Sequence, residues 1–234
     1  MIVVVGLPAY TDAPDGERCA GGLAVDVAVA AGRRGATVEL VGKVGEDGAG
    51  DAVVVALGRM GVGHAALLRD PVRPTPVLTV SAGSGTTGSG IAERDAESSA
   101  EAPEIDADVA PVARLLPDDA ALRPTLEAAD VELGLRYLAA AGVIVVADLL
   151  SEPALTAAVD AAAFATARLV LLIPEGAAVP VLPAEATVLE APIDDDGSFG
   201  RLVGTFAAAL DAGSEPGAAF NEAVRSAGWE PSEN

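Results

Sequence analysis

The fold of this chain is most constrained by a series of short apolar runs that alternate with helix-like segments. Strands with one face in water alternate apolar and polar residues, whereas strands buried on both faces stay largely apolar. The runs follow the second pattern, and they lie at residues 2–6, 37–42, 77–80, 143–148, 168–173 and 186–189. This pattern predicts an α/β fold, with a mainly parallel sheet covered by helices on both faces. In such folds ligands bind beyond the carboxyl ends of the strands.

The length of 234 residues predicts a single domain, residues 1–234, with a substantial core. Hydrophobic residues make up 51% of the chain but aromatic residues only 3%, so the core must consist of Ala, Val and Leu. Residues 81–108 change to Gly, Ser, Thr, Ala and acidic residues, which predicts a flexible acidic loop within the domain. Residues 7–20 are rich in Pro, Asp and Gly and predict a shorter loop.

The charge of the chain is strongly negative. Asp and Glu number 35 against 14 Lys and Arg, which gives a formal net charge of −21. A nucleic acid or an anionic membrane would need a basic surface, so both partners are disfavoured. No apolar run reaches transmembrane length and the N-terminus lacks the basic region of a signal peptide, so a cytoplasmic protein is expected. The acidity fits a halophilic, salt-rich cytosol and equally an acidic sequence style without salt adaptation.

The sequence gives no sign of a metal site built from cysteine or histidine. Cys19 is the only cysteine, which excludes a zinc site made of several cysteines. His64 is the only histidine, and alone it is expected to be structural. Asp51 precedes an apolar helical face and is the predicted cap of that helix.

One stretch, residues 193–202, carries two opposing signals. Gly197 stands in a turn that opens a helix, where free N–H groups form a seat for an anion such as phosphate. Asp194, Asp195 and Asp196 precede this turn and would repel a phosphate unless a cation intervened. The three aspartates equally fit a solvated acidic loop with no ligand role.

A second glycine turn, Gly21-Gly22, opens another apolar helix, and Asp26 lies in its first turns. A carboxylate there interacts favourably with the positive end of the helix dipole. The same carboxylate is equally a polar group aimed at a ligand from a glycine-lined helix start. The residue alone leaves both interpretations open.

Two separated stretches resemble the ribokinase, or PfkB-type, family of carbohydrate kinases. Residues 19–62 carry a double glycine, a helix, and the loop Val-Gly-Lys-Val-Gly-Glu-Asp-Gly-Ala-Gly at 41–50, which is similar to the family's VGxVGxDxxG loop. Residues 194–210 resemble the family's DTTGAGDAF box and the alanine-rich helix after it. The resemblance implies a three-layer αβα sandwich. Because residues 7–20 are short, it also implies a reduced or missing lid, the segment that excludes water.

The resemblance implies an activity as well: ATP-dependent phosphoryl transfer to a sugar or nucleoside hydroxyl, with ATP and Mg²⁺ as cofactors. In this chemistry a carboxylate accepts the hydroxyl proton, while backbone N–H groups stabilise the phosphoryl group. Matched by position, the sugar or nucleoside would contact Gly21, Gly22, Asp26 and Asp12. The nucleotide phosphates would contact Gly197, Ser198 and Gly200.

The chain departs from the family at the catalytic position. Gly200 stands where the family has its catalytic aspartate, and glycine has no side chain to accept a proton. Phe199 stands where the box has glycine, and it is expected to crowd the turn. One hypothesis is a degenerate, kinase-like protein with weak or no phosphoryl transfer. A second is an active kinase whose base is displaced to Asp194, Asp195 or Asp196. A third is a non-catalytic assembly protein, with a homodimer as one arrangement.

Overall fold

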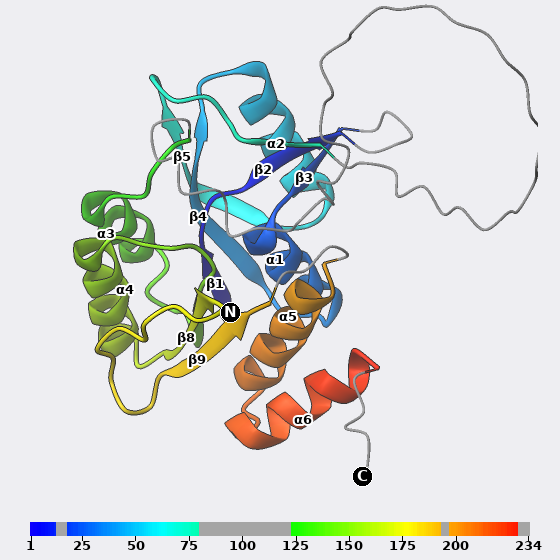
Figure 1. Cartoon of the computed structure of the whole chain (residues 1–234), viewed down its shortest axis with the longest axis vertical. Coiled ribbons are helices and arrows are strands. Elements are labelled where there is room, and N and C mark those ends of the chain that lie inside the picture. Colours follow the sequence, from blue (N-terminus) through cyan, green and yellow to red (C-terminus); the bar gives the residue numbers. More distant parts are fainter. Residues whose placement is uncertain (13–17, 80–122, 193–196, 229–234) are drawn as a thin grey trace, which may run out of the picture.

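The computed structural model describes residues 1–12, 18–79, 123–192 and 197–228. Its main sheet has the strand order β5-β4-β1-β7-β8-β9, and all neighbouring strands pair in parallel (Figure 1). The strands are β1 (Ile2–Val5), β4 (Val38–Gly45), β5 (Gly63–Asp70), β7 (Val143–Val146), β8 (Arg168–Pro174) and β9 (Thr187–Ala191). The mainly parallel sheet predicted from the apolar runs is confirmed, except that the run at 77–80 contributes no strand to it and β5 lies outside the predicted runs.

Helices cover both faces of this sheet, so the three-layer arrangement is confirmed too (Figure 1). One face packs against α1 (Leu23–Arg33), α2 (Gly48–Arg59), α5 (Ser198–Asp211) and α6 (Pro216–Ser226). The other face packs against α3 (Ala128–Arg136) and α4 (Glu152–Ala165). Successive side chains of a strand point to opposite faces, so Ile2 and Val4 of β1 join the first layer and Val3 and Val5 the second. This explains why the strands are apolar throughout.

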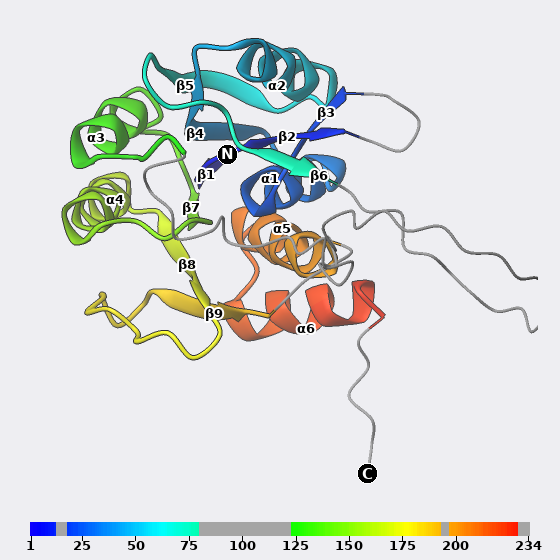
Figure 2. The same ribbon diagram turned by 45° about the horizontal axis from the view of Figure 1, so that its top comes forward.

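A second, small sheet stands beside the carboxyl end of the first. It consists of β2 (Ala9–Asp12), β3 (Arg18–Gly21) and β6 (Val77–Thr79), in the order β3-β2-β6 (Figure 2). The predicted loop over residues 7–20 is therefore wrong for the residues of β2 and β3. Strand β2 is completed by pairing with β6, which lies far along the chain, and the local Pro, Asp and Gly pattern carries no trace of that pairing. The reduced or missing lid that the resemblance implies stays a prediction.

The predicted acidic loop at 81–108 lies outside the described residues. Within the described ranges, no helix has both the length and the apolar character needed to cross a bilayer.

Candidate functional site

A buried ion pair lies at the carboxyl edge of the main sheet. Asp148 follows β7, and its side chain is 6% exposed, while that of Arg123 is 12% exposed. Arg123 Nη1 donates to both carboxylate oxygens of Asp148, at 3.3 and 3.4 Å, and the Leu149 N–H donates to Oδ1 at 2.7 Å. The buried Nε of Arg123 has no hydrogen-bond partner among the described residues. The ion pair is enclosed, but not all of its hydrogen-bonding groups have partners among the described residues.

Burial raises the pKa of the Asp148 carboxyl above its ordinary value of 3.8, because the charged form loses its hydration. The Arg123 guanidinium and the N–H groups of Leu149 and Leu7 offset only part of this effect. A carboxyl with a perturbed pKa at this edge of a parallel sheet is a candidate functional residue. Because Arg123 and Leu149 already occupy its oxygens, the geometry fits a positioning role better than proton transfer.

A second polar cluster joins the end of β4 and the start of α2 to the segment that leads into β6. Asp47 accepts hydrogen bonds from the Gly50 N–H at 2.7 Å, the Thr75 N–H at 2.8 Å and the Thr75 hydroxyl at 2.7 Å. Asp47 is therefore the cap of α2, and the prediction of Asp51 as the cap is wrong. The helix starts before Asp51, whose 75%-exposed side chain pairs with Arg69. The acidic residue of the family-like loop has a structural role here.

Replacing Asp47 by Ala is expected to destabilise the protein by about 1–2 kcal/mol, the usual cost of losing a helix cap. Burial raises the pKa of Asp47, but the hydrogen bonds from Thr75, Gly50 and Ala49 outweigh burial and hold that pKa below 3.8. A carboxyl whose pKa is lowered by folding stabilises the folded protein at pH values above its pKa in the unfolded chain. This contribution is lost as the pH falls through the pKa of the folded protein. The loss of stability in Asp47→Ala should therefore be full at neutral pH and shrink only below about pH 4.

Urea denaturation of Asp47→Ala beside Asp51→Ala measures this difference. Asp51 is the matched control, since it lies four residues away and makes only an exposed ion pair. An equal loss of stability in the two variants would contradict the assignment of Asp47 as the cap.

The structure brings together only some of the residues that the resemblance assigns to the sugar. Gly22 is the N-cap of α1 with φ of +93°, a conformation that favours glycine, and the Asp26 N–H donates to its carbonyl at 3.0 Å. Gly21 ends β3 and pairs with Ala9 of β2. The backbone of Asp12 lies at the other end of the same hairpin, about 10 Å along the strand.

The first residues of α5 face three different neighbours. Ser198 lines a cavity beside α1 and α6, whereas Phe199 is 5% exposed and packs in the core next to β9. Gly200 faces α1. Gly197, the N-cap, has φ of +69°, which again favours glycine. The ring of Phe199 thus packs into the core rather than filling the turn that it was expected to crowd.

Gly200 lies so close to α1 that a side chain has no room there. A Cβ built on Gly200 would lie 2.6 Å from the Cβ of Asp26, closer than real Cβ atoms come to their neighbours. One turn later, a Cβ built on Gly204 would likewise lie 2.6 Å from the Cβ of Ala30. The Asp26 carboxylate also lies beside the start of α5, since its Oδ2 is 3.4 Å from a Cβ built on Gly197. The Nη1 of Arg201 is 3.5 Å from the same point, so a carboxylate and a guanidinium stand together where the resemblance assigns the nucleotide phosphates.

The Asp26 carboxylate and the Arg201 guanidinium both lie at this helix start, so charge alone does not exclude the phosphates of ATP with Mg²⁺ there. Over the described ranges, no three His, Cys, Asp or Glu side chains are grouped so as to hold a metal ion. The proposed displaced bases Asp194, Asp195 and Asp196 lie outside the described residues.

A cavity of about 400 Å³ runs along α5, near the carboxyl ends of β8 and β9. The rings of Phe199 and Phe220 line it together with Pro192, Glu175 and Glu190. Its volume lies in the range of small-molecule sites. Two apolar rings and two carboxylates suit a flat ligand that carries hydrogen-bond donors, and they do not suit a phosphate.

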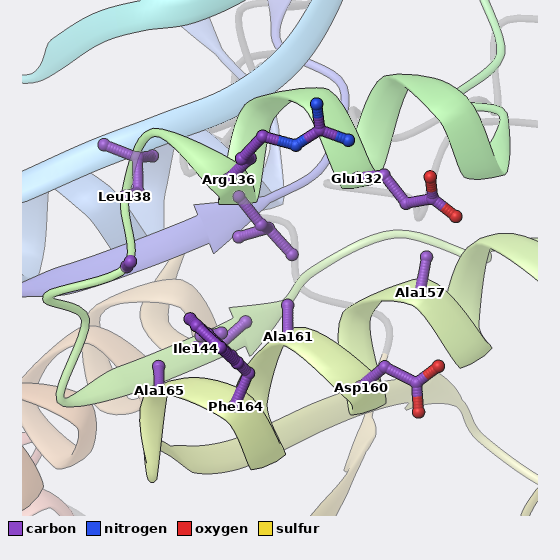
Figure 3. Close-up of a pocket in the computed structure, with 11 residues that line it drawn as sticks. Glu132, Arg136, Leu138, Ile144, Ala157, Asp160, Ala161, Phe164 and Ala165 are labelled. Carbon is purple, nitrogen blue, oxygen red and sulfur yellow. The ribbon is translucent and has the colours of Figure 1, made fainter.

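A cavity of about 380 Å³ lies on the opposite face of the sheet, between α3 and α4 (Figure 3). Apolar side chains such as Ile144 and Phe164 line it, with the charged groups of Glu132, Arg136 and Asp160 around them. None of the residues that the sequence assigns to a site lies in its lining, so it is not part of the candidate site.

Comparison with known proteins identifies the fold. Neither the family models nor the curated proteins show a match to this sequence. Among solved structures, the ribokinase of Arabidopsis thaliana in complex with ribose and ATP matches with a TM-score of 0.60 and 14% identity, over 97% of this chain and 90% of that one. A candidate ribokinase II from E. coli, in complex with ATP and Mg²⁺, matches with a TM-score of 0.59 and 14% identity, over 95% and 89%. A candidate phosphofructokinase from Staphylococcus aureus matches with a TM-score of 0.58 and 13% identity, over 98% and 92%.

These likenesses show that the chain has the ribokinase-like fold, as the sequence predicted. At such low identity they show the fold alone.

The Arg123–Asp148 pair is the part of the candidate site that the sequence analysis missed. Asp148 directly follows the apolar run of β7, and the rule that ligands lie beyond the carboxyl ends of parallel strands could have singled it out. Arg123 had no comparable signal, because only the folded chain brings it to Asp148.

Proposed function

We propose that this chain is a carbohydrate-kinase-like protein in which phosphoryl transfer to a sugar or nucleoside hydroxyl is weak or lost. The observation that carries the proposal is the contact between Gly200 and Asp26. The position that the resemblance assigns to the catalytic base has no side chain, and the neighbouring helix fills the space that one would need. Loss of a general base costs about 10²–10⁴ in rate.

The surroundings of α5 support the same proposal. Asp26 and Arg201 both lie beside Gly197, so their charges offset one another and give a triphosphate no excess of positive charge at the helix start. The nearby cavity lined by Phe199 and Phe220 is large enough for a small ligand. A protein with these two features binds a small molecule without transferring a phosphoryl group efficiently.

An active sugar or nucleoside kinase is the second candidate. It requires Asp194, Asp195 or Asp196 to accept the hydroxyl proton in place of the missing aspartate. The fold likeness to kinases favours this candidate, and the geometry around Gly200 does not.

ADP release from ATP and Mg²⁺, measured in molar KCl over a panel of sugars and nucleosides, separates the two candidates. We expect turnover at background level with every substrate, in protein shown to be folded by circular dichroism. Turnover above background that disappears in the triple variant D194A/D195A/D196A would overturn our proposal in favour of the displaced base.

A charge-matched control keeps this experiment specific. The triple variant E152A/E185A/E222A removes the same number of negative charges from exposed positions on other parts of the surface. Any turnover that this control also loses reflects the charge of the protein rather than a catalytic carboxylate.

A further inference from the structure

A small cavity with a basic lining lies on the outer side of the helical layer, between α1, α5 and α6. Its volume is about 240 Å³. Arg33 and Arg34 reach it from the end of α1, and Arg201 from the first turns of α5. The rest of the lining is apolar or carries hydroxyl groups: Ala30, Ser198, Leu202, Thr205, Ala223, Ser226 and Ala227.

Three of the 14 basic residues of a chain with 35 acidic ones thus surround one cavity. Arg34 Nη2 donates to the Ser226 hydroxyl at 2.7 Å, and both residues line the cavity. Arg33 has no carboxylate partner among the described residues. Arg201 Nη1 lies near the Asp26 carboxylate, since a Cβ built on Gly197 is 3.5 Å from the first and 3.4 Å from the second.

Helix dipoles do not cancel this positive charge. The C-termini of α1 and α6 end at the cavity and contribute roughly half a negative charge each, while the start of α5 contributes roughly half a positive charge. Among the described residues, and with the Asp26 carboxylate included, the three guanidinium groups still leave an excess of roughly one to two positive charges. A local positive excess on a chain of net charge −21 indicates a site that attracts an anion.

We propose that this cavity binds a small phosphate-bearing anion. Guanidinium groups donate paired hydrogen bonds that match phosphate oxygens, and the hydroxyls of Thr205 and Ser226 add further donors. The volume is below the range of drug-sized ligands, so it suits a phosphate, a pyrophosphate or a short phosphate ester rather than a nucleotide. The site is separate from the cavity beside Phe199 and does not depend on kinase activity.

Isothermal titration of the full chain with inorganic phosphate, pyrophosphate and glycerol phosphate, each in dilute buffer, tests the proposal. We expect one-to-one binding of at least one of these anions. The three probes distinguish a free ion from a phosphate ester. Citrate serves as the carboxylate probe and should bind more weakly.

Arg33→Gln and Arg34→Gln each remove one guanidinium group, and each should weaken binding about tenfold to a hundredfold, the loss expected for a hydrogen bond to a charged group. Arg59→Gln is the matched control, because Arg59 also ends a helix at the surface but lines a different region. The affinity of Arg59→Gln for the phosphate probes should stay unchanged. No binding of any phosphate probe, equal binding in all three variants, or tighter binding of citrate would each overturn the proposal.

Discussion

Arg123→Met is expected to destabilise the protein by about 3–5 kcal/mol at neutral pH, because it leaves the buried carboxylate of Asp148 without its cation. The loss should depend on pH. A carboxyl whose pKa is raised by folding stabilises the folded protein in its protonated form. This stabilisation is present at low pH and is lost as the pH rises through the pKa of the folded protein. Since Arg123 lowers the pKa of Asp148, the variant's pKa is higher still, and the loss of stability should be full above the variant's pKa and shrink as the pH falls from there to the parent's pKa. Guanidinium denaturation at several pH values measures the effect.

Two further variants identify the cause. Asp148→Asn leaves the buried Arg123 guanidinium unpaired, and that group stays charged, so its deficit should not shrink in acid. The double variant R123M/D148L removes both charges, and replacing a buried pair by apolar residues is often neutral or stabilising. Unchanged stability of Arg123→Met at neutral pH would contradict the ion pair described here.

Gly200→Asp, which restores the aspartate of the family motif, is expected to destabilise the protein by about 1–3 kcal/mol, the usual cost of overpacking. It should not produce kinase activity. The new Cβ would lie 2.6 Å from the Cβ of Asp26, so α1 and α5 must separate to admit it. The exchange D26G/G200D relieves this contact and should recover most of the loss. Thermal unfolding of the single and double variants in a double-mutant cycle measures the coupling.

Gly32→Ala is the control for the general effect of replacing a helical glycine. Gly32 lies on the same helix as Asp26, and nothing lies within 4 Å of a Cβ built on it. This change should stabilise the protein by about 0.5–1 kcal/mol. If Gly200→Asp were as stable as the parent protein, or showed turnover above background, the packing argument behind the proposed function would be wrong.

The order of strands and helices was predictable because their signals are local. A strand buried on both faces must be apolar throughout, and the residues of β1, β7 and β8 carry that pattern. The glycines at 22 and 197 were also correctly placed at helix starts. The small sheet was missed because β2 completes its hydrogen bonding with β6, and no local pattern connects two strands so far apart.

The cap of α2 was misplaced for a related reason. Both Asp47 and Asp51 have the right side chain to cap a helix, and the sequence alone favoured the one nearer the apolar face. The deciding contacts come from Thr75, which donates twice to Asp47 from a different part of the chain. A long-range partner thus fixed the start of a local element.

The sequence by itself determined the class of fold and the absence of an aspartate at residue 200, because both follow from residue type and spacing. Only the tertiary structure decided what that absence means, since it sets the Cβ of Asp26 against Gly200 and leaves no space for a side chain. It likewise joined Arg123 to Asp148 and brought Arg33, Arg34 and Arg201 to one cavity. These contacts link residues that are distant in the chain, and their energies depend on burial and distance, which a sequence pattern does not encode.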